Sequence, residues 1–203
     1  MKAFKFLAAT YAQDLLDGKV YFNSASAMRT ADGYDDGRSD DQELISRGYI
    51  HSGEQVLRNG HPHAGFYRGP GDVVVTGYKS EIIDDSYLLY CMAVEFNKDV
   101  AASMREKFAA DACVEICDIE AFFDVIATHP FLHQYGCDLA VGPVRYELEE
   151  RVSIQDAQGI DPFVKRKKYA WQKECRIVIR GLPIDKAILL NIPMVRTLVR
   201  RIL

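Results

Sequence analysis

The chain has 203 residues, of which 48% are hydrophobic, so it is long enough for one well-buried domain and short for two. Its formal net charge of −4 argues against a protein that binds nucleic acid or membrane surfaces through a broad positive field. We therefore expect a single domain over residues 1–203, in which any basic binding surface is a local patch.

Cysteine usage and the absence of long apolar runs bear on the compartment. The five cysteines are an odd number, and several lie in apolar stretches, which favours reduced thiols in a cytoplasmic protein. Residues 1–9 superficially resemble a secretion signal, but polar and acidic residues soon follow, at Asp14 and Asp17. No apolar run has the length of a bilayer span, so no membrane partner is expected.

The first predicted elements are short. Residues 4–7 predict a strand, and Thr10 is a candidate N-cap for a helix that runs to Leu16 and ends at Gly18. Residues 20–23 predict a second strand.

The next part of the chain is less regular. Residues 24–41 are rich in Ser, Gly and Asp and have no hydrophobic period, which predicts a long loop; we expect it to form one wall of a ligand cleft. A helix is predicted over residues 42–49 and a second irregular region over 60–71. Strands are predicted at 73–75 and 87–96 from their β-branched and aromatic content.

Helical spacing returns in residues 99–109, where one stripe carries Val100, Met104 and Phe108. Asp118 is a good N-cap for a following helix. The remaining predicted elements are a hairpin of 141–146 with 151–154 and two late strands at 175–179 and 187–190.

Strands outnumber helices, and the helices lie mostly in the first two thirds, which predicts an α+β domain built on a mainly antiparallel sheet. A doubly wound parallel fold would need regular alternation of strand and helix. The sequence also contains neither a Gly-x-Gly-x-x-Gly turn nor a phosphate-binding loop that ends in Lys-Ser/Thr. Nucleotide binding of those two kinds is therefore not expected.

The segment from Tyr169 to Arg180 places Gln172 and Glu174 at the mouth of an apolar strand. On an extended backbone these two side chains point the same way. A carboxylate with an amide two residues before it suits sugar chemistry, because the acid stabilises positive charge on a ribose carbon while the amide orients an acceptor. The alternative is the solvated side of a half-buried strand, which is common in antiparallel sheets.

A second candidate motif is the aromatic strand that carries Tyr21 and runs into Ser24 and Ser26. Hydroxyls at a strand end can bond a ribose or hold a carboxylate in place, and aromatic rings can stack on a flat ligand. The alternative is a turn, in which serine is favoured because it bonds the local backbone.

One dense basic run precedes Tyr169 and Trp171; it consists of Lys165, Arg166, Lys167 and Lys168. A polynucleotide acceptor can lie along such a run with its bases on the aromatic rings. The alternative is a solvated flank that keeps a strand from aggregating. The His and Cys spacings match no zinc pattern, and the acidic residues between 32 and 41 lack calcium-loop spacing, so no metal is predicted.

Together the two polar motifs resemble those of the ADP-ribosyltransferase superfamily. Its members carry an aromatic-flanked serine motif on an early strand, matched here by Tyr21, Ser24 and Ser26, and a Glu-x-Glu or Gln-x-Glu motif at the opening of a late strand, matched by Gln172 and Glu174.

The chain is similar in particular to a bacterial branch of the superfamily that includes abortive-infection proteins of phage defence. The matching pieces are residues 4–7, 15–22, 23–36 and 165–177. Residues 29–36 replace the usual Asn-Asp-Pro after the serines, and the early His or Arg that contacts NAD in many transferases is not evident near Lys5.

The resemblance implies a split, mainly antiparallel sheet and an NAD-dependent mono-ADP-ribosyltransferase that modifies a protein or a nucleic acid. Glu174 would bond the ribose 2′-hydroxyl and stabilise the oxocarbenium-like centre, and Gln172 would orient the acceptor. Expected NAD contacts are Tyr21, Ser24, Ser26, Arg29, Tyr34 and Lys5. Rival interpretations are an NAD glycohydrolase and a non-catalytic binding module. For Glu174→Gln we expect lost turnover and little change in stability.

Overall fold

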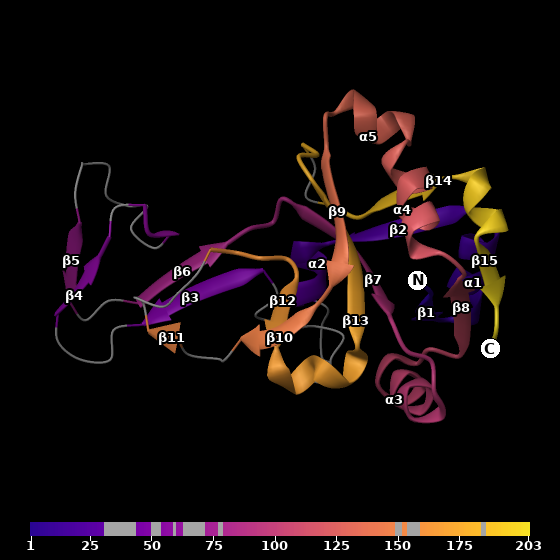
Figure 1. Ribbon diagram of the computed structural model, residues 1–203, viewed down its shortest axis with the longest axis horizontal. Coiled ribbons are helices and arrows are strands. Elements are labelled where there is room, and N and C mark those ends of the chain that lie inside the picture. The colour runs from indigo at the N-terminus through magenta and orange to yellow at the C-terminus, as the bar shows by residue number, and fades with distance from the viewer. Residues whose placement is uncertain are drawn as a thin grey trace.

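The computed structural model describes residues 1–30, 44–49, 54–58, 60–62, 72–76, 79–148, 152–153, 159–183 and 186–203. Figure 1 shows a body of sheet and helices from which a narrow arm of strands projects. The body is an α+β structure built on a mainly antiparallel sheet of eight strands, as the sequence predicts at this level. Among the described residues, no helix combines the length and the apolar character needed to cross a membrane.

The eight strands of the body all pair in antiparallel fashion. They are β1 (Ala3–Leu7), β2 (Lys19–Ser24), β7 (Tyr87–Ala93), β8 (Ala112–Ile116), β9 (Asp138–Pro143), β13 (Glu174–Arg180), β14 (Ile188–Asn191) and β15 (Val199–Arg201). One path through the sheet runs β14-β2-β7-β1-β8-β15, and β13 joins β7 to β9. The strands predicted at 4–7, 20–23, 175–179 and 187–190 are therefore confirmed, with ends that move by one or two residues.

The sheet forks along β7. One edge of β7 pairs with β13 over its whole length, from Tyr87 opposite Arg180 to Ala93 opposite Glu174. The other edge is shared, because β2 pairs at Leu88 and Leu89 whereas β1 pairs at Ala93. We call the point where β1 and β2 diverge the fork; it lies beside the intervening residues of β7.

Helices cover both faces of the sheet. The main core packs one face against α1 (Ala9–Leu16), α4 (Ile119–Ala127), α5 (Pro130–Gln134) and the 3₁₀ helix η3 (Pro193–Thr197). The other face is covered by α2 (Ala25–Thr30), by α3 (Lys98–Phe108) and by the segment around Phe163. Strand β13 is therefore buried on both sides, which explains the apolar run Ile177–Ile179 in its second half.

Local signals predict several helix ends correctly. Asp118 is the N-cap of α4, where its Oδ1 accepts hydrogen bonds from the backbone N–H groups of Glu120 and Ala121. The helix predicted over 99–109 is α3, and its stripe residues Val100 and Met104 are buried. Gly18 follows α1 with a left-handed φ of 83°.

The start of α1 differs from its prediction. Thr10 is not the N-cap, since the helix begins at Ala9 after Ala8, which makes no side-chain cap. The backbone N–H of Ala9 instead donates to Asp111 Oδ1 at 2.6 Å, so a residue from a distant part of the chain satisfies the first turn.

Three further predictions are wrong. The loop predicted from Ser24 to Asp41 contains α2, while residues 31–41 lie outside the described part. Residues 45–49, predicted as helix, form strand β3 (Ile45–Tyr49), which pairs with β6 (Lys79–Ile83). The predicted hairpin does not form, because β9 pairs with β13 and β11 (Val152–Ser153) runs parallel to β3.

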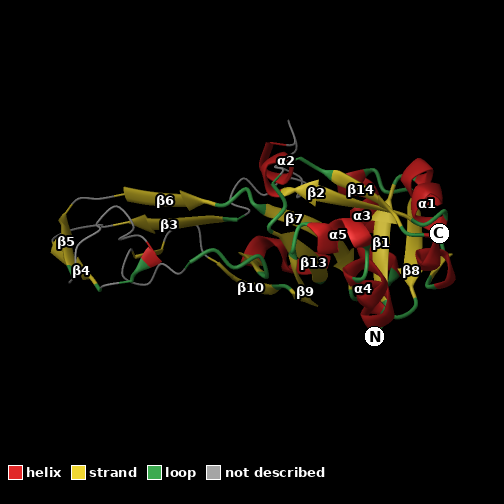
Figure 2. Cartoon of the chain, turned by 90° about the horizontal axis from the view of Figure 1, so that it is seen from above, coloured by secondary structure: helices red, strands yellow, loops and turns green. Residues whose placement is uncertain are grey.

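The arm contains β3, β6 and β11, and beyond them the pair β4 (Glu54–Leu57) and β5 (Val73–Thr76). Figure 2 shows the arm from a second direction, again extended away from the body. The strand predicted at 73–75 is confirmed as β5. A short parallel pair, β10 (Arg145–Leu148) with β12 (Val164–Arg166), precedes the 3₁₀ helix η2 (Lys167–Gln172) and leads the chain into β13.

Candidate active site

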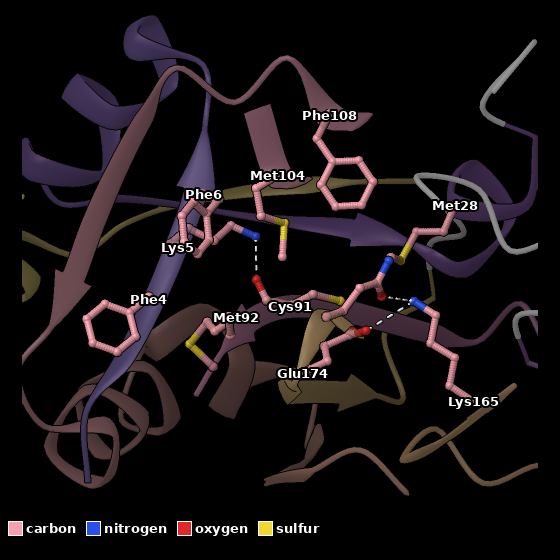
Figure 3. A pocket seen from close by; sticks show the side chains of 12 residues that line it. Phe4, Lys5, Phe6, Met28, Cys91, Met92, Met104, Phe108, Lys165 and Glu174 are labelled. Atoms are coloured by element: carbon pink, nitrogen blue, oxygen red, sulfur yellow. Dashed lines mark hydrogen bonds and ion pairs between the residues drawn. The ribbon is translucent and has the colours of Figure 1, made fainter. Parts of the chain in front are cut away.

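A cavity of about 190 Å³ lies at the fork (Figure 3). Its walls are mostly aromatic and sulfur-containing side chains, namely Phe4, Phe6, Met28, Met92, Met104 and Phe108. Its polar side chains are Lys5, Cys91, Lys165, Gln172 and Glu174. The apolar and polar lining residues together come from β1, β7, α2, α3, β12, η2 and β13, so distant segments meet where the sheet divides.

Glu174 is fixed at the floor of this pocket by its backbone. Lys173 takes a left-handed conformation, φ 46°, which ends η2 and turns the chain into β13. The backbone N–H of Glu174 then donates to Tyr146 Oη at 2.7 Å, and its carbonyl accepts from the N–H of Val144. These bonds hold the first residue of the strand against β10 at Tyr146 and against Val144, which lies between β9 and β10.

The Glu174 carboxylate sits between two cations. Arg176 Nε donates to Oε1 at 2.6 Å, and Lys165 Nζ donates to Oε2 at 3.1 Å. The ammonium of Lys165 also donates to Gln172 Oε1 at 2.8 Å. We call these four residues the charge cluster. Their side chains are almost completely buried, with Arg176 at 0% exposure and Glu174 at 6%.

Burial and charge act on the Glu174 carboxyl in opposite directions. Burial alone would raise its pKa, but the charges of Arg176 and Lys165 outweigh that effect and hold the pKa well below the ordinary range. Burial also raises the pKa of the Cys91 thiol to about 12, so this thiol stays protonated in the pocket. Glu174 is thus ionised at neutral pH.

Gln172 and Glu174 share the pocket, but not for the expected reason. Gln172 belongs to η2 and not to an extended strand, so the predicted alternation does not apply to it. Lys165 brings the two side chains together, because its ammonium donates a hydrogen bond to each of them. The interpretation as a solvated strand face is wrong, since Gln172, Glu174 and Arg176 are all buried.

Lys5 lies on β1 at the opposite wall. Its Nζ donates to the carbonyl oxygen of Cys91 at 2.6 Å, directly at the fork, and lies 4.5 Å from the ring centroid of Tyr90. Burial lowers the pKa of Lys5, an effect that the neighbouring Cys91 and Glu174 offset only in part. Figure 3 shows Lys5 and Lys165 on either side of Cys91.

The serine motif lies away from the pocket. The Ser24 and Ser26 hydroxyls are 3.1 Å apart, and Ser24 Oγ accepts from the backbone N–H of Ala27, so Ser24 caps α2. Ser24 pairs with Leu88 whereas Glu174 pairs with Ala93, a separation of roughly 17 Å along β7 at about 3.4 Å per residue. The expectation that these hydroxyls meet the carboxylate is therefore wrong.

Other expected NAD contacts are also outside the pocket or outside the described part. Tyr21 is 54% exposed and pairs with Leu189 on β14. Arg29 belongs to α2, but its side chain, like Tyr34 as a whole, falls outside the described residues. From the segment predicted as one wall of the cleft, Met28 lines the cavity.

The basic run divides into two halves. Lys165 and Arg166 are buried, at 5% and 6% exposure, and Arg166 donates to Tyr169 Oη. The expectation that these two residues contact a polynucleotide acceptor of ADP-ribose is therefore wrong. Lys167 and Lys168 are exposed. The solvated flank and the acceptor contact therefore remain alternatives for these two residues only.

Sequence reasoning missed Arg176, Tyr146 and Cys91 as site residues. Arg176 was on the same strand face as Glu174, and a cation two residues from a carboxylate was a usable signal. Tyr146 and Cys91 arrive through strand pairing, which spacing does not reveal. Within the described ranges, no group of three or more His, Cys, Asp or Glu side chains is arranged to hold a metal ion.

Comparisons with protein-family models, with curated proteins and with solved structures find no match to this chain. What the pocket can do is therefore inferred from its own geometry.

Proposed function

We propose that the chain is an NAD-dependent mono-ADP-ribosyltransferase that acts on a macromolecular acceptor, with Glu174 as its catalytic carboxylate. The observation that carries the proposal is that Glu174, Gln172 and Lys5 line one pocket at the fork. The fork itself supports a split sheet of the ADP-ribosyltransferase type. From the resemblance to abortive-infection proteins we further propose a setting in phage–host conflict.

The chemistry needs little more than a placed negative charge. Cleavage of the bond between ribose and nicotinamide builds positive charge on the anomeric carbon, and the electron pair of the broken bond returns to the pyridinium ring. Nicotinamide leaves as a neutral molecule, so no general acid is required. A nucleophile on the acceptor then bonds that carbon and loses its proton to solvent. Glu174, ionised throughout, stabilises the intermediate charge.

The carboxylate retains room for a ligand. A carboxylate offers about four acceptor positions. Arg176 and Lys165 use two of them, which leaves acceptor capacity for a ribose 2′-hydroxyl. The cavity, at about 190 Å³, is smaller than the roughly 300–1,000 Å³ typical of small-molecule sites. On its volume, we propose that it holds the nicotinamide ring and the reacting ribose carbon, and that the rest of NAD lies outside it.

Two rival functions have specific support. Gln172 is buried and bonded to Lys165, which limits its reach toward a macromolecule and favours water as acceptor, as in an NAD glycohydrolase. Both oxygens of Glu174 accept from cations, which is also what a purely structural ion cluster in a non-catalytic module would show. One set of variants separates all three.

The decisive variant is Glu174→Gln. An amide cannot offer negative charge to the developing cation, so we expect turnover to fall by roughly 10²–10³. The structure revises the expectation for stability, because the change leaves Lys165 and Arg176 buried without their counter-charge. Breaking a buried pair costs about 3–5 kcal/mol, so a lowered melting temperature is expected as well.

The measurements are nicotinamide release and ADP-ribose transfer from labelled NAD, made at a temperature where a melting curve shows each variant folded. Glu115→Gln is the matched control, since Glu115 is also little exposed and bound by two cations, Lys2 and Arg200, but lies outside the pocket. Should Glu174→Gln not fold, Glu174→Gln with Lys165→Met restores the charge balance.

Each outcome assigns one function. Release of nicotinamide without transfer to any macromolecule identifies the glycohydrolase. A folded Glu174→Gln variant that turns over NAD like the Glu115→Gln control rules out Glu174 as the catalytic carboxylate. A wild type that neither binds nor consumes NAD leaves the non-catalytic module.

A further inference from the structure

Beside the pocket, the last turn of α3 and the helix η2 form a surface of lysines around the chain's single tryptophan. In a 3₁₀ helix, side chains three residues apart lie on the same side, so Lys168 and Trp171 share one face of η2. From α3, Lys107 Nζ lies 5.1 Å from the centroid of the Trp171 ring. We call Lys107, Lys167, Lys168 and Trp171 the lysine–tryptophan surface.

This surface is continuous with the pocket. The rings of Trp171 and Phe108 are 5.7 Å apart, and Phe108 is a wall of the cavity. The residue after Trp171 is Gln172, which lines the same cavity. A ligand that occupies the surface therefore lies next to the Glu174 carboxylate.

The lysines of the surface lie against aromatic rings: Lys168 Nζ is 5.1 Å from the centroid of the Tyr169 ring, and Lys107 Nζ lies over Trp171. Lys167 and Lys168 are exposed, and within the described part of the chain none of the three lysines forms an ion pair with a carboxylate. Lys173, which follows, is excluded because its Nζ lies 4.0 Å from Glu95. The lysine–tryptophan surface is positive, although the whole chain carries a net charge of −4.

Positive charge alternating with a flat ring selects a particular polyanion. Lysines bind backbone phosphates without regard to sequence, and aromatic side chains stack on unpaired bases. A duplex keeps its bases stacked on each other, and an acidic peptide has no ring to offer to Trp171. Unpaired nucleic acid is the one of these that uses both halves of the surface.

We infer that the lysine–tryptophan surface binds single-stranded nucleic acid, with phosphates on Lys107, Lys167 and Lys168 and a base on Trp171 at the mouth of the pocket. As the acceptor of ADP-ribose, this strand deepens the proposed function and rests on it. Binding of the strand itself requires no NAD.

The experiment measures binding in the absence of NAD. A labelled oligothymidine of about 12 nucleotides is titrated by fluorescence anisotropy at several salt concentrations. Trp171, the only tryptophan, reports directly, because stacking of a base on its ring quenches its fluorescence. Poly-glutamate and a blunt DNA duplex are the comparison probes.

The test variant is Lys167→Ser with Lys168→Ser, and the control is Lys19→Ser with Lys186→Ser. The control removes the same charge on or next to β2 and β14, away from η2 in Figure 1. We expect the oligonucleotide to quench Trp171, and the test variant to lose about tenfold or more in affinity at low salt. Its slope of log affinity against log salt should flatten by about 1.4, while the control keeps the wild-type slope.

Several results would overturn the inference: no binding of the oligonucleotide, binding without quenching, equal binding of poly-glutamate or duplex, or equal losses in the two double variants. A wild type that transfers ADP-ribose to proteins but does not bind the oligonucleotide refutes the inference and leaves the proposed function intact. Oligonucleotide binding with quenching but without any NAD turnover supports the inference and refutes the proposed function.

Discussion

The carboxylate of Glu174 is surrounded by donors whose charge it must balance. Arg176 and Lys165 reach it from its own strand and from β12, and both cations are almost completely buried. The same contacts that place Glu174 for chemistry therefore also tie it to the stability of the body. This double role makes its titration measurable in folding as well as in activity.

The stability of the fold should depend on pH through Glu174. Its pKa is lower in the folded chain than the unfolded value near 4.3, so the unfolded chain binds more protons between these two values. The contribution is fully present above about pH 4.3 and is lost as the pH falls toward the folded pKa. We expect the free energy of unfolding in urea to drop steeply below about pH 4 in the wild type and less steeply in Glu174→Gln. Equal slopes for the two proteins would contradict this account. A residual slope is expected in both proteins, because the pKa of Glu115 is also lowered, by its hydrogen bonds with Lys2 and Arg200.

A second residue-level prediction concerns Tyr90. Its ring packs against Phe22 and Phe122 in the main core, but its buried hydroxyl has no hydrogen-bond partner among the described residues. Burial of an unpaired hydroxyl costs about 1–3 kcal/mol. Tyr90→Phe should therefore leave stability unchanged or raise it by about 1 kcal/mol in urea unfolding. A clear loss of stability would reveal a partner for the hydroxyl.

Spacing along the sequence predicts a shared face only where the backbone is extended. Glu174 and Gln172 do line one pocket, but η2 and the bridge through Lys165 bring them together, and alternation along a strand does not. The prediction for Ser24 is wrong because Ser24 and Glu174 pair with residues of β7 that are five positions apart. This register depends on strand partners that the local sequence does not specify.

Among the elements, predictions from local chemistry succeed and those that need a distant partner fail. Asp118 caps α4 through its own neighbours, so the sequence suffices. Ile45–Tyr49 becomes a strand because it pairs with β6, from Ile83 to Lys79, and tertiary pairing overrides local preference. The start of α1 depends likewise on Asp111.

Gly18 allows a prediction at the level of the turn between α1 and β2. Its φ of 83° is left-handed, and a Cβ at this position would lie 2.7 Å from the carbonyl oxygen of Ile192. Gly18→Ala should therefore lower the free energy of unfolding by more than about 1 kcal/mol. Gly136→Ala is the control, because its φ of 60° is also positive but nothing lies within 4 Å of the added Cβ. Equal losses would show that strain alone, without the close contact, determines the cost.

For the whole molecule, the sequence predicts the α+β class and the antiparallel sheet but not the arm. The arm has exposed valines at positions 56 and 74 and its own strand pairs, so alternation there resembles that of any half-buried strand. Among the residues that the structure describes, the main core contains none from the arm. The body should therefore fold without the outer part of the arm, residues 50–78.

Removal of residues 50–78 tests this independence. Tyr49 and Lys79 pair directly at the end of β3 and β6, so an Asn-Gly turn can connect them. We expect the shortened chain to melt cooperatively within a few degrees of the wild type and to keep its nicotinamide release. Loss of the cooperative transition would show that the arm is part of the body's fold, whereas loss of turnover alone would assign the arm to substrate binding.

Strand β13 lies between β7 and β9, both of which precede it in the chain. On the ribosome these two strands emerge first, and each has an open edge until residues 174–180 have been made. The central ladder can then close only through contacts between segments far apart in sequence, which makes folding slow compared with that of helical proteins of similar size. Nascent chains that stop before β13 would expose these edges, and they should be aggregation-prone and depend on chaperones until synthesis is nearly finished.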